Sequence, residues 1–286
     1  MTVSIISACK NRGRALSIAI ASWIQFDEVN EIIVTDWNSD EPVAHLAELD
    51  SRIKIITVPD EPYFNQPQPL NLAASLVTSD HILKLDSDTI MNPYFNFFDN
   101  HTIDNNSFLT GTDELCQFSV DNPQQGNKFD YQKYPYLKAL WGTLYTTTKN
   151  YFKVGGYNEN MSKYAAWEDN EIYERFLRLG LNHVKIKFDL KTLFSLPHSS
   201  KKRVENFQAY EENSNLQIII RDHIKKYNNV DDDNVVHKLL LEKHNRINWK
   251  KYKLKKESSY YIEPVIKWDI DQVSSQQYVA QKILNK

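Results

Sequence analysis

Two aspartates, Asp86 and Asp88, directly follow a short apolar segment at residues 81–85. Such a segment is typical of a buried strand, and ligands of open α/β sheets bind beyond the carboxyl ends of strands. Two close carboxylates repel each other, and a divalent cation removes that repulsion while it binds phosphate oxygens on its other side. The pair therefore indicates a metal site, although Asp and Ser are also common in solvated turns.

A second acidic pair, Glu168 and Asp169, follows Trp167 and opens a segment with helical spacing. A carboxylate at this place can act as a general base towards an acceptor hydroxyl. Negative charges are also favoured in the first turn of a helix, so a structural role stays open. Farther along, His198 follows a proline, and a neutral imidazole is a ligand for manganese-like ions, although a lone histidine is more often structural.

Two earlier turns also carry polar groups. Lys10 and Arg12 follow the first apolar segment, where their charges can bind phosphate or simply face solvent. The glycine-rich dinucleotide fingerprint and the Walker A sequence are both missing, so a phosphate group would need a metal or basic side chains. Asp36 closes the second apolar segment beside Trp37, where a carboxylate can bind a base or ribose and an indole can stack. The same residues also suit a turn with Asx-type hydrogen bonds.

The pattern of elements that would hold these residues is a strand–helix alternation. Segments with strand character alternate with amphipathic ones, which predicts a mostly parallel sheet with right-handed crossovers. The expected strands cover residues 3–7, 31–35, 53–58 and 81–85, and the expected helices cover 14–25, 69–77 and 168–179. Gly180 suits the position just after the last of these helices. Residues 92–136 receive no assignment.

The composition changes after Pro197, where no glycine remains and lysine and asparagine increase. We therefore predict an α/β domain over residues 1–204 and a helical C-terminal extension over 205–286, with helices at 216–226 and 235–244. The extension is expected to pack on the first domain through Tyr260, Tyr261, Ile262 and Trp268. Contact with a membrane surface or a partner protein is the alternative.

Bulk properties limit the classes of function. The 286 residues are 41% hydrophobic and 25% charged, as in soluble globular proteins, and the formal charge of -3 gives no reason to expect nucleic acid. Two cysteines cannot build a zinc site or a disulfide framework, so a metal would be oxygen-bound, such as Mg²⁺ or Mn²⁺. With no signal-peptide pattern and no transmembrane segment, the expected location is cytoplasmic.

In their order, the motifs resemble those of GT-A fold glycosyltransferases of the family 2 type, with an acceptor region similar to that of β-galactosyltransferases. The resemblance covers residues 2–200 and rests on Ser7–Arg12, Ile33–Ser39, Asn71, Leu85–Asp88, Gly155–Tyr157 and Trp167–Asp169. It implies a GT-A fold with a mostly parallel central sheet flanked by helices. Two positions depart from the pattern. The turn that usually reads Asp-Asp-Gly-Ser is Asp36-Trp37-Asn38-Ser39 here, so the second carboxylate is missing, and Leu70 stands where many relatives carry arginine.

The resemblance implies a metal-dependent, inverting hexosyltransferase that moves a sugar from a UDP-sugar donor to a hydroxyl of a glycan or glycoconjugate. Mn²⁺ or Mg²⁺ would be the cofactor, held by Asp88 and His198 together with Asp86. Glu168 would bind acceptor hydroxyls and Asp169 would act as the base. The residues implied in donor binding are Ala8, Lys10, Asn11, Arg12, Asp36, Asn71, Asp86 and Trp167.

Two other classes of function stay open. Residues 83–89 resemble the nucleophile motif of haloacid-dehalogenase-type phosphatases, in which Asp86 would be the nucleophile and Asp88 the acid/base. Such enzymes need a later strand that ends in paired aspartates, and the acidic cluster at 231–233 follows a segment too polar for a buried strand. The second alternative is a non-catalytic protein that binds sugar nucleotides or glycans. The donor sugar and the acceptor are not fixed by these residues.

Overall fold

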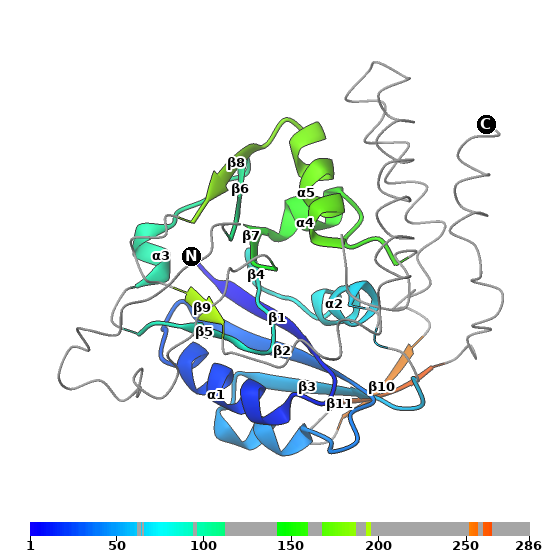
Figure 1. Ribbon diagram of the computed structural model, residues 1–286. Coiled ribbons are helices and arrows are strands. Elements are labelled where there is room, and N and C mark those ends of the chain that lie inside the picture. The colour runs from blue at the N-terminus through cyan, green and yellow to red at the C-terminus, as the bar shows by residue number, and fades with distance from the viewer. Residues whose placement is uncertain are drawn as a thin grey trace, which may run out of the picture.

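The computed structural model describes residues 1–61, 64, 66–93, 96–111, 142–159, 168–186, 193–195, 252–256 and 260–264. Within these residues the chain forms a nine-stranded mixed sheet and a separate two-stranded sheet. Helices cover both faces of the large sheet (Figure 1). None of the helices in these residues is long and apolar enough to cross a membrane.

The centre of the large sheet is parallel, as the sequence predicts. Its strands stand in the order β3-β2-β1-β4, and each pair of neighbours is parallel. Their bounds are Val3–Cys9 (β1), Val29–Trp37 (β2), Ile53–Val58 (β3) and His81–Lys84 (β4). The connecting elements are helix α1 (Gly13–Trp23), the 3₁₀ helix η1 (Ala44–Leu49) and helix α2 (Pro67–Ala74). Parallel strands share one direction, so the turns after β1, β2 and β4 all lie at the carboxyl ends of the strands, on the same side of the sheet.

A mixed part extends the sheet beyond β4. There β7 is antiparallel to both β4 and β6, and β8 runs parallel to β6. These strands are β6 (Ser107–Thr110), β7 (Leu144–Thr147) and β8 (Asn182–Lys185), while β5 (Thr89–Met91) and β9 (Leu193–Ser195) form the separate pair. The remaining helices are α3 (Phe97–Asn100), α4 (Thr148–Lys153) and α5 (Glu168–Arg178), the last starting at the predicted residue.

Two apolar clusters fill the two faces of the sheet because successive strand residues point to opposite sides. Ile5 of β1 belongs to the cluster that includes the buried side of α1, whereas its neighbour Ile6 belongs to the other cluster. That second cluster includes residues of α2, α4 and α5, and these helices lie on the opposite face from α1 (Figure 1). The second face therefore brings α5 close to the end of β4.

The described part of the C-terminal extension is β structure rather than helix. Strands β10 (Tyr252–Lys256) and β11 (Tyr260–Pro264) are antiparallel to each other, β11 runs parallel to β3, and β10 forms the edge of the sheet. An edge strand offers unpaired N–H and C=O groups, and segments rich in tyrosine and branched residues suit such pairing. The helices expected at 216–226 and 235–244, the boundary at 204/205 and Trp268 lie outside the described residues.

The fold predicts unequal effects of two substitutions on α5. Phe176 is fully buried and stacks on Phe108 of β6 with ring centroids 5.0 Å apart, whereas its neighbour Leu177 is 49% exposed. We expect Phe176→Ala to lower the free energy of unfolding by about 3–5 kcal/mol, because it leaves a cavity. Leu177→Ala is expected to change it by less than about 0.5 kcal/mol. Urea unfolding of both variants measures the difference, and equal effects would contradict this packing.

Candidate active site

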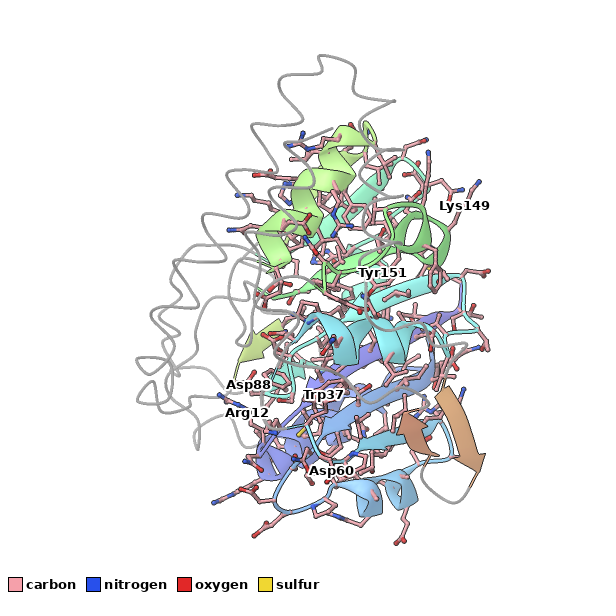
Figure 2. All side chains as sticks on the ribbon, turned by 90° about the vertical axis from the view of Figure 1, so that its right-hand side faces the viewer. Arg12, Trp37, Asp60, Asp88, Lys149 and Tyr151 are labelled. Carbon is pink, nitrogen blue, oxygen red and sulfur yellow. The ribbon has the colours of Figure 1, made fainter. Side chains whose placement is uncertain are left out.

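The turns after β1 and β4 meet in an ion pair. Nη1 of Arg12 lies 3.2 Å from Oδ2 of Asp88 (Figure 2). The Asp88 side chain is only 9% exposed, whereas that of Arg12 is 38% exposed. The carboxylate predicted to bind a metal therefore already has a positive charge beside it, supplied by a side chain that reaches solvent.

The turn after β2 is held by its own aspartate. Asp36 is fully buried, and its two carboxylate oxygens accept hydrogen bonds from the main-chain N–H groups of Ser39 (3.3 Å) and Val43 (3.0 Å). Trp37 is 1% exposed and packs in the core of the second face, so its indole does not present a stacking surface. The Asx-type alternative thus describes the bonding of Asp36 in this structure.

Other residues of the first turn join it to neighbouring loops. Lys10 Nζ donates to the main-chain oxygen of Glu61 at 2.7 Å. Asn11 and Asp40 bond in both directions, because the Asn11 amide donates to the Asp40 carboxylate at 3.1 Å and accepts from the Asp40 N–H at 2.8 Å. Ala8 lies near the end of β1 and is 8% exposed. These contacts fix the shape of the turn.

A buried lysine joins the two acidic pairs. Lys84, the last residue of β4, is 0% exposed, and its Nζ lies 2.8 Å from Oδ1 of Asp86 and 3.4 Å from Oδ1 of Asp169. Gln66 also donates to Asp86, at 3.1 Å. The sequence analysis missed Lys84 as a site residue, although a lysine inside an otherwise apolar strand was a signal. Asp86 and Asp169, which are far apart in the sequence, are brought together as expected of one site.

The acidic pair at the start of α5 is strongly affected by burial. Desolvation raises the pKa of Asp169, although the charge of Lys84 opposes this, and the Tyr157 hydroxyl donates to Asp169 Oδ1 at 3.0 Å. Desolvation and the neighbouring Asp169 raise the pKa of Glu168 from its ordinary 4.5 to about 8. Oε2 of Glu168 is buried without a hydrogen-bond partner among the described residues. Such an atom is suited to bind a hydroxyl that enters the site.

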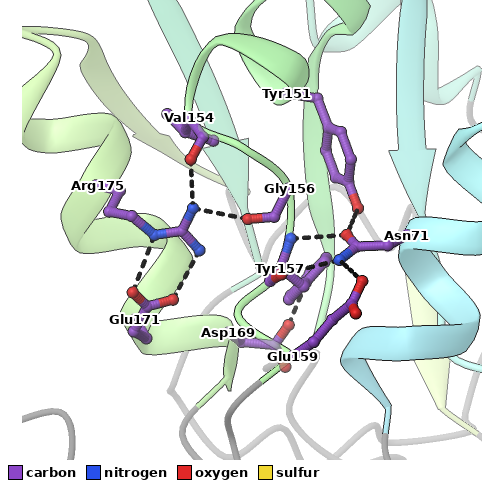
Figure 3. A network of polar contacts seen from close by, with 9 residues as sticks. All are labelled: Asn71, Tyr151, Val154, Gly156, Tyr157, Glu159, Asp169, Glu171 and Arg175. Carbon is purple, nitrogen blue, oxygen red and sulfur yellow. Dashed lines mark hydrogen bonds and ion pairs between the residues drawn. The ribbon is translucent and has the colours of Figure 1, made fainter. Parts of the chain in front are cut away.

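Asn71 of α2 holds the segment that carries Tyr157 (Figure 3). Its Oδ1 accepts from the Tyr157 N–H (2.8 Å) and the Tyr151 hydroxyl (2.9 Å). Its Nδ2 donates to the Tyr157 carbonyl (2.9 Å) and to Oε1 of Glu159 (2.7 Å). An amide offers two donors and two acceptor positions, so this side chain is fully used. Gly156 has φ +71°, and a Cβ there would meet Asn71 Oδ1.

A buried ion pair on α5 holds the same segment from the other side (Figure 3). The guanidinium of Arg175 makes two hydrogen bonds with the carboxylate of Glu171, at 2.9 and 2.6 Å. Its Nη1 also donates to the carbonyls of Val154 (2.7 Å) and Gly156 (2.6 Å). Asn71 and Arg175 together fix the segment whose Tyr157 bonds to Asp169.

Two of the described residues could hold part of a metal site. Asp86 and Asp88 offer hard carboxylate oxygens, and the guanidinium of Arg12 stands in for a cation at Asp88. These residues therefore fit a magnesium-like or manganese-like ion, although the described part of the chain contains no group of three metal-binding side chains. His198 and Trp167 lie outside the described residues.

Comparison of the sequence with known families gives one match. Residues 124–199 match the model described as the N-terminal domain of galactosyltransferase. The matched segment includes Gly156, Tyr157, Glu168 and Asp169, and Asp169 contacts both Lys84 and the Tyr157 hydroxyl. No curated protein matches the sequence.

Many solved structures are similar to this chain, and three of them follow. The catalytic domain of Drosophila β1,4-galactosyltransferase 7, in complex with xylobiose, has 13% identity and a TM-score of 0.50, with 95% of this chain and 97% of that one covered. S. aureus TarS 1–349, in complex with UDP, has 16% identity and a TM-score of 0.47, with 73% and 64% covered. Mannosyltransferase PcManGT from Pyrobaculum calidifontis, in complex with GDP-Man and Mn²⁺, has 11% identity and a TM-score of 0.46, with 76% and 61% covered. The chain spans a little under two thirds of the TarS and PcManGT chains. The likeness to the Drosophila enzyme confirms the GT-A type of fold.

The raised pKa of Glu168 makes stability depend on pH. Between its ordinary pKa of 4.5 and about 8 the folded chain holds a proton that the unfolded chain has released. The free energy of unfolding contributed by this group therefore falls as pH rises through that range and stays level above it. We expect Glu168→Gln, which stays neutral, to weaken this decline in urea unfolding measured from about pH 5 to about pH 8. Glu174→Gln, on the same helix, is the control and should keep the decline.

The bonding of Asn71 predicts a large cost for its closest isostere. In Asn71→Asp, a carboxylate oxygen replaces the amide that donates to Tyr157 and Glu159, so a buried negative charge faces two acceptors. We expect the free energy of unfolding to fall by about 3 kcal/mol or more. Asn30→Asp, at an exposed position of β2, serves as the control and should change it by less than about 0.5 kcal/mol. A tolerated Asn71→Asp would mean that these four hydrogen bonds do not hold the segment.

Proposed function

We propose that this chain is a metal-dependent, inverting glycosyltransferase that moves a sugar from a UDP-sugar donor to a hydroxyl of a glycan or glycoconjugate. The proposal is carried by the contact of Lys84 with both Asp86, at the end of β4, and Asp169, at the start of α5. This contact brings the carboxylate expected on the donor side next to the one expected on the acceptor side. The galactosyltransferase family match over residues 124–199 supports the same assignment.

On the donor side, Asp86 and Asp88 would hold the metal, together with His198. When bound, a divalent metal ion supplies positive charge that stabilises the departing diphosphate. Arg12 would serve the same diphosphate, because its exposed guanidinium reaches the edge of the sheet where Asp88 lies. This role would offset the missing arginine at Leu70, which is fully buried in the core. A mutant of the Drosophila enzyme named above was solved with manganese, UDP-Gal and xylobiose.

On the acceptor side, Asp169 would take the proton of the attacking hydroxyl. The hydroxyl oxygen then bonds to the anomeric carbon while the bond from that carbon to the diphosphate breaks, and its electron pair leaves with the nucleotide. Attack from the face opposite the nucleotide inverts the configuration. Glu168 is suited to orient the hydroxyl, because its buried Oε2 offers an acceptor and its carboxyl is protonated up to about pH 8.

The phosphatase alternative fits the structure poorly. Its motif belongs near the start of the core, whereas β4 follows three other parallel strands along the chain and has an antiparallel neighbour, β7. In that alternative Asp86 would be the nucleophile, yet its Oδ1 is bound by Lys84 and Gln66. The acidic cluster at 231–233 lies outside the described residues. A non-catalytic binding protein is left as an outcome of the experiment below.

Uridine and guanosine sugars, each with and without Mn²⁺, should be screened for nucleotide release and for protection against thermal unfolding. We expect one donor to raise the unfolding temperature only with the metal present, because a ligand that binds the folded state stabilises it. Asp169→Asn should keep this protection and lower the transfer rate by about 100- to 10,000-fold, the range lost with a general base. Asp27→Asn, at an exposed position, is the matched control and should transfer normally.

The other outcomes separate the alternatives. Metal-dependent protection of the wild-type protein without transfer would favour a binding protein, and phosphate release from a simple phosphoester would favour a phosphatase. Full transfer by Asp169→Asn would assign the base to another residue. Absence of protection by every nucleotide sugar would contradict the proposed function.

A further inference from the structure

Lys84 contacts the carboxylates of the site from the interior of the protein and has no surface of its own in the site. Its side chain is 0% exposed, whereas the side chains of Asp86 and Asp169 are 40% and 19% exposed. The ammonium group therefore reaches both carboxylates from the protein interior, while each carboxylate keeps a surface towards solvent. Lys84 itself is too deep to touch a substrate.

Gly142, which has no side chain, leaves space for the contact between Lys84 and Asp86. A Cβ at Gly142 would lie 2.6 Å from Lys84 Nζ and 2.6 Å from Asp86 Oδ2, so any larger residue would push the pair apart. Gln66 and Tyr157 each donate a second hydrogen bond to the carboxylate oxygen that Lys84 also contacts. Each carboxylate is thus held at one oxygen by one charged and one neutral donor.

A structural role alone does not account for a lysine at this position. Burying an ammonium group is costly, and apolar residues of similar volume often stabilise a core as well as or better than a buried ion pair does. The preceding residues of β4, Ile82 and Leu83, are apolar and buried. The charge of Lys84 is therefore explained by the carboxylates that it contacts.

We propose that Lys84 is a positioning residue that fixes Asp169 as the base beside the donor carboxylate Asp86. The inference rests on the proposed function and adds to it a residue that acts through another. The Nζ of Lys84 lies 2.8 Å from Asp86 and 3.4 Å from Asp169, so one ammonium group contacts both carboxylates. Its charge lets both carboxylates be ionised at close range, so Asp169 can accept a proton while Asp86 serves the donor.

Removal of this charge should change catalysis in a pH-dependent way. The charged and titratable groups that face Asp169 are Lys84, Asp86, Tyr157, Glu168 and Tyr173, and Lys84 is the cation among these described groups. In Lys84→Met the base should need a higher pH to ionise. We expect kcat near neutral pH to fall by about 10- to 100-fold, with the KM for donor little changed, and the loss to shrink as pH rises. Initial rates at saturating donor and acceptor over a pH series measure this.

Lys54→Met provides a control for the loss of a partly buried ion pair, because the Lys54 side chain is 29% exposed. Lys54 Nζ lies 2.6 Å from Oε2 of Glu31, whose side chain is 5% exposed, and the pair belongs to β3 and β2 of the same sheet. Its variant is expected to lose stability but to keep the pH profile of kcat. A constant ratio of wild-type to Lys84→Met activity at every pH, or no loss at all, would overturn the inference.

A double-mutant cycle gives a readout that does not need activity. Lys84→Met leaves Asp169 buried without its cation, and Asp169→Asn removes the charge that then lacks a partner. The free energy of unfolding of the combined variant should therefore be higher than the sum of the two single effects predicts. If Lys84→Met alone does not fold, the combined variant should still fold. Additive effects would overturn the inference. Failure of the proposed function is distinct, because it would appear as a wild-type protein that transfers no sugar.

Discussion

Carboxylates that gather in a partly buried site cannot all stay ionised unless a positive charge lies among them. The topology of this chain creates that problem, because Asp86 follows a parallel strand and Asp169 begins a helix packed on the same face. Lys84 supplies this positive charge from inside the sheet, because its Nζ lies 2.8 Å from Asp86 and 3.4 Å from Asp169. Desolvation and the neighbouring Asp169 raise the pKa of Glu168, although the charge of Lys84 opposes this.

The same site depends on polar contacts that bridge separate elements. Asn71 of α2 and Arg175 of α5 hold the segment around Gly156 and Tyr157 from two sides (Figure 3). Both side chains are almost completely buried, so each contact is made where water cannot replace it. The orientation of the Tyr157 hydroxyl towards Asp169 follows from these contacts. The candidate base is thus fixed by residues that no substrate would touch.

Periodicity and strand-ending carboxylates predicted much of this arrangement. The four parallel strands and the start of α5 follow from apolar patterns of local sequence, which is why they could be predicted. Lys84 could not be assigned, since its partner Asp169 becomes a neighbour only through the fold. Asp36 was expected to bind the donor, which stays a prediction; the two N–H groups that bond to its oxygens come from a turn whose shape local sequence does not specify. Strands β10 and β11 were missed because β11 takes its pairing from β3 and β10 from β11, and their own sequence does not specify these partners.

Arg12 and Lys84 differ in exposure, and this difference matches the different needs of the donor side and the acceptor side in the proposed transfer reaction. Arg12 is 38% exposed and its contact with Asp88 joins two turns, so water can solvate its guanidinium when a ligand replaces that contact. Lys84 is fully buried, and leaving its carboxylates would cost it both partners and any solvation. In the proposed reaction, a charge on the donor side would have to be exchangeable, because nucleotide would arrive and depart in each turnover. On the acceptor side the charge would have to persist, because the proposed base would have to be ionised before each hydroxyl binds. The exposed side chain of Arg12 suits the first requirement and the buried side chain of Lys84 suits the second, and both lie at the carboxyl ends of the same parallel strands.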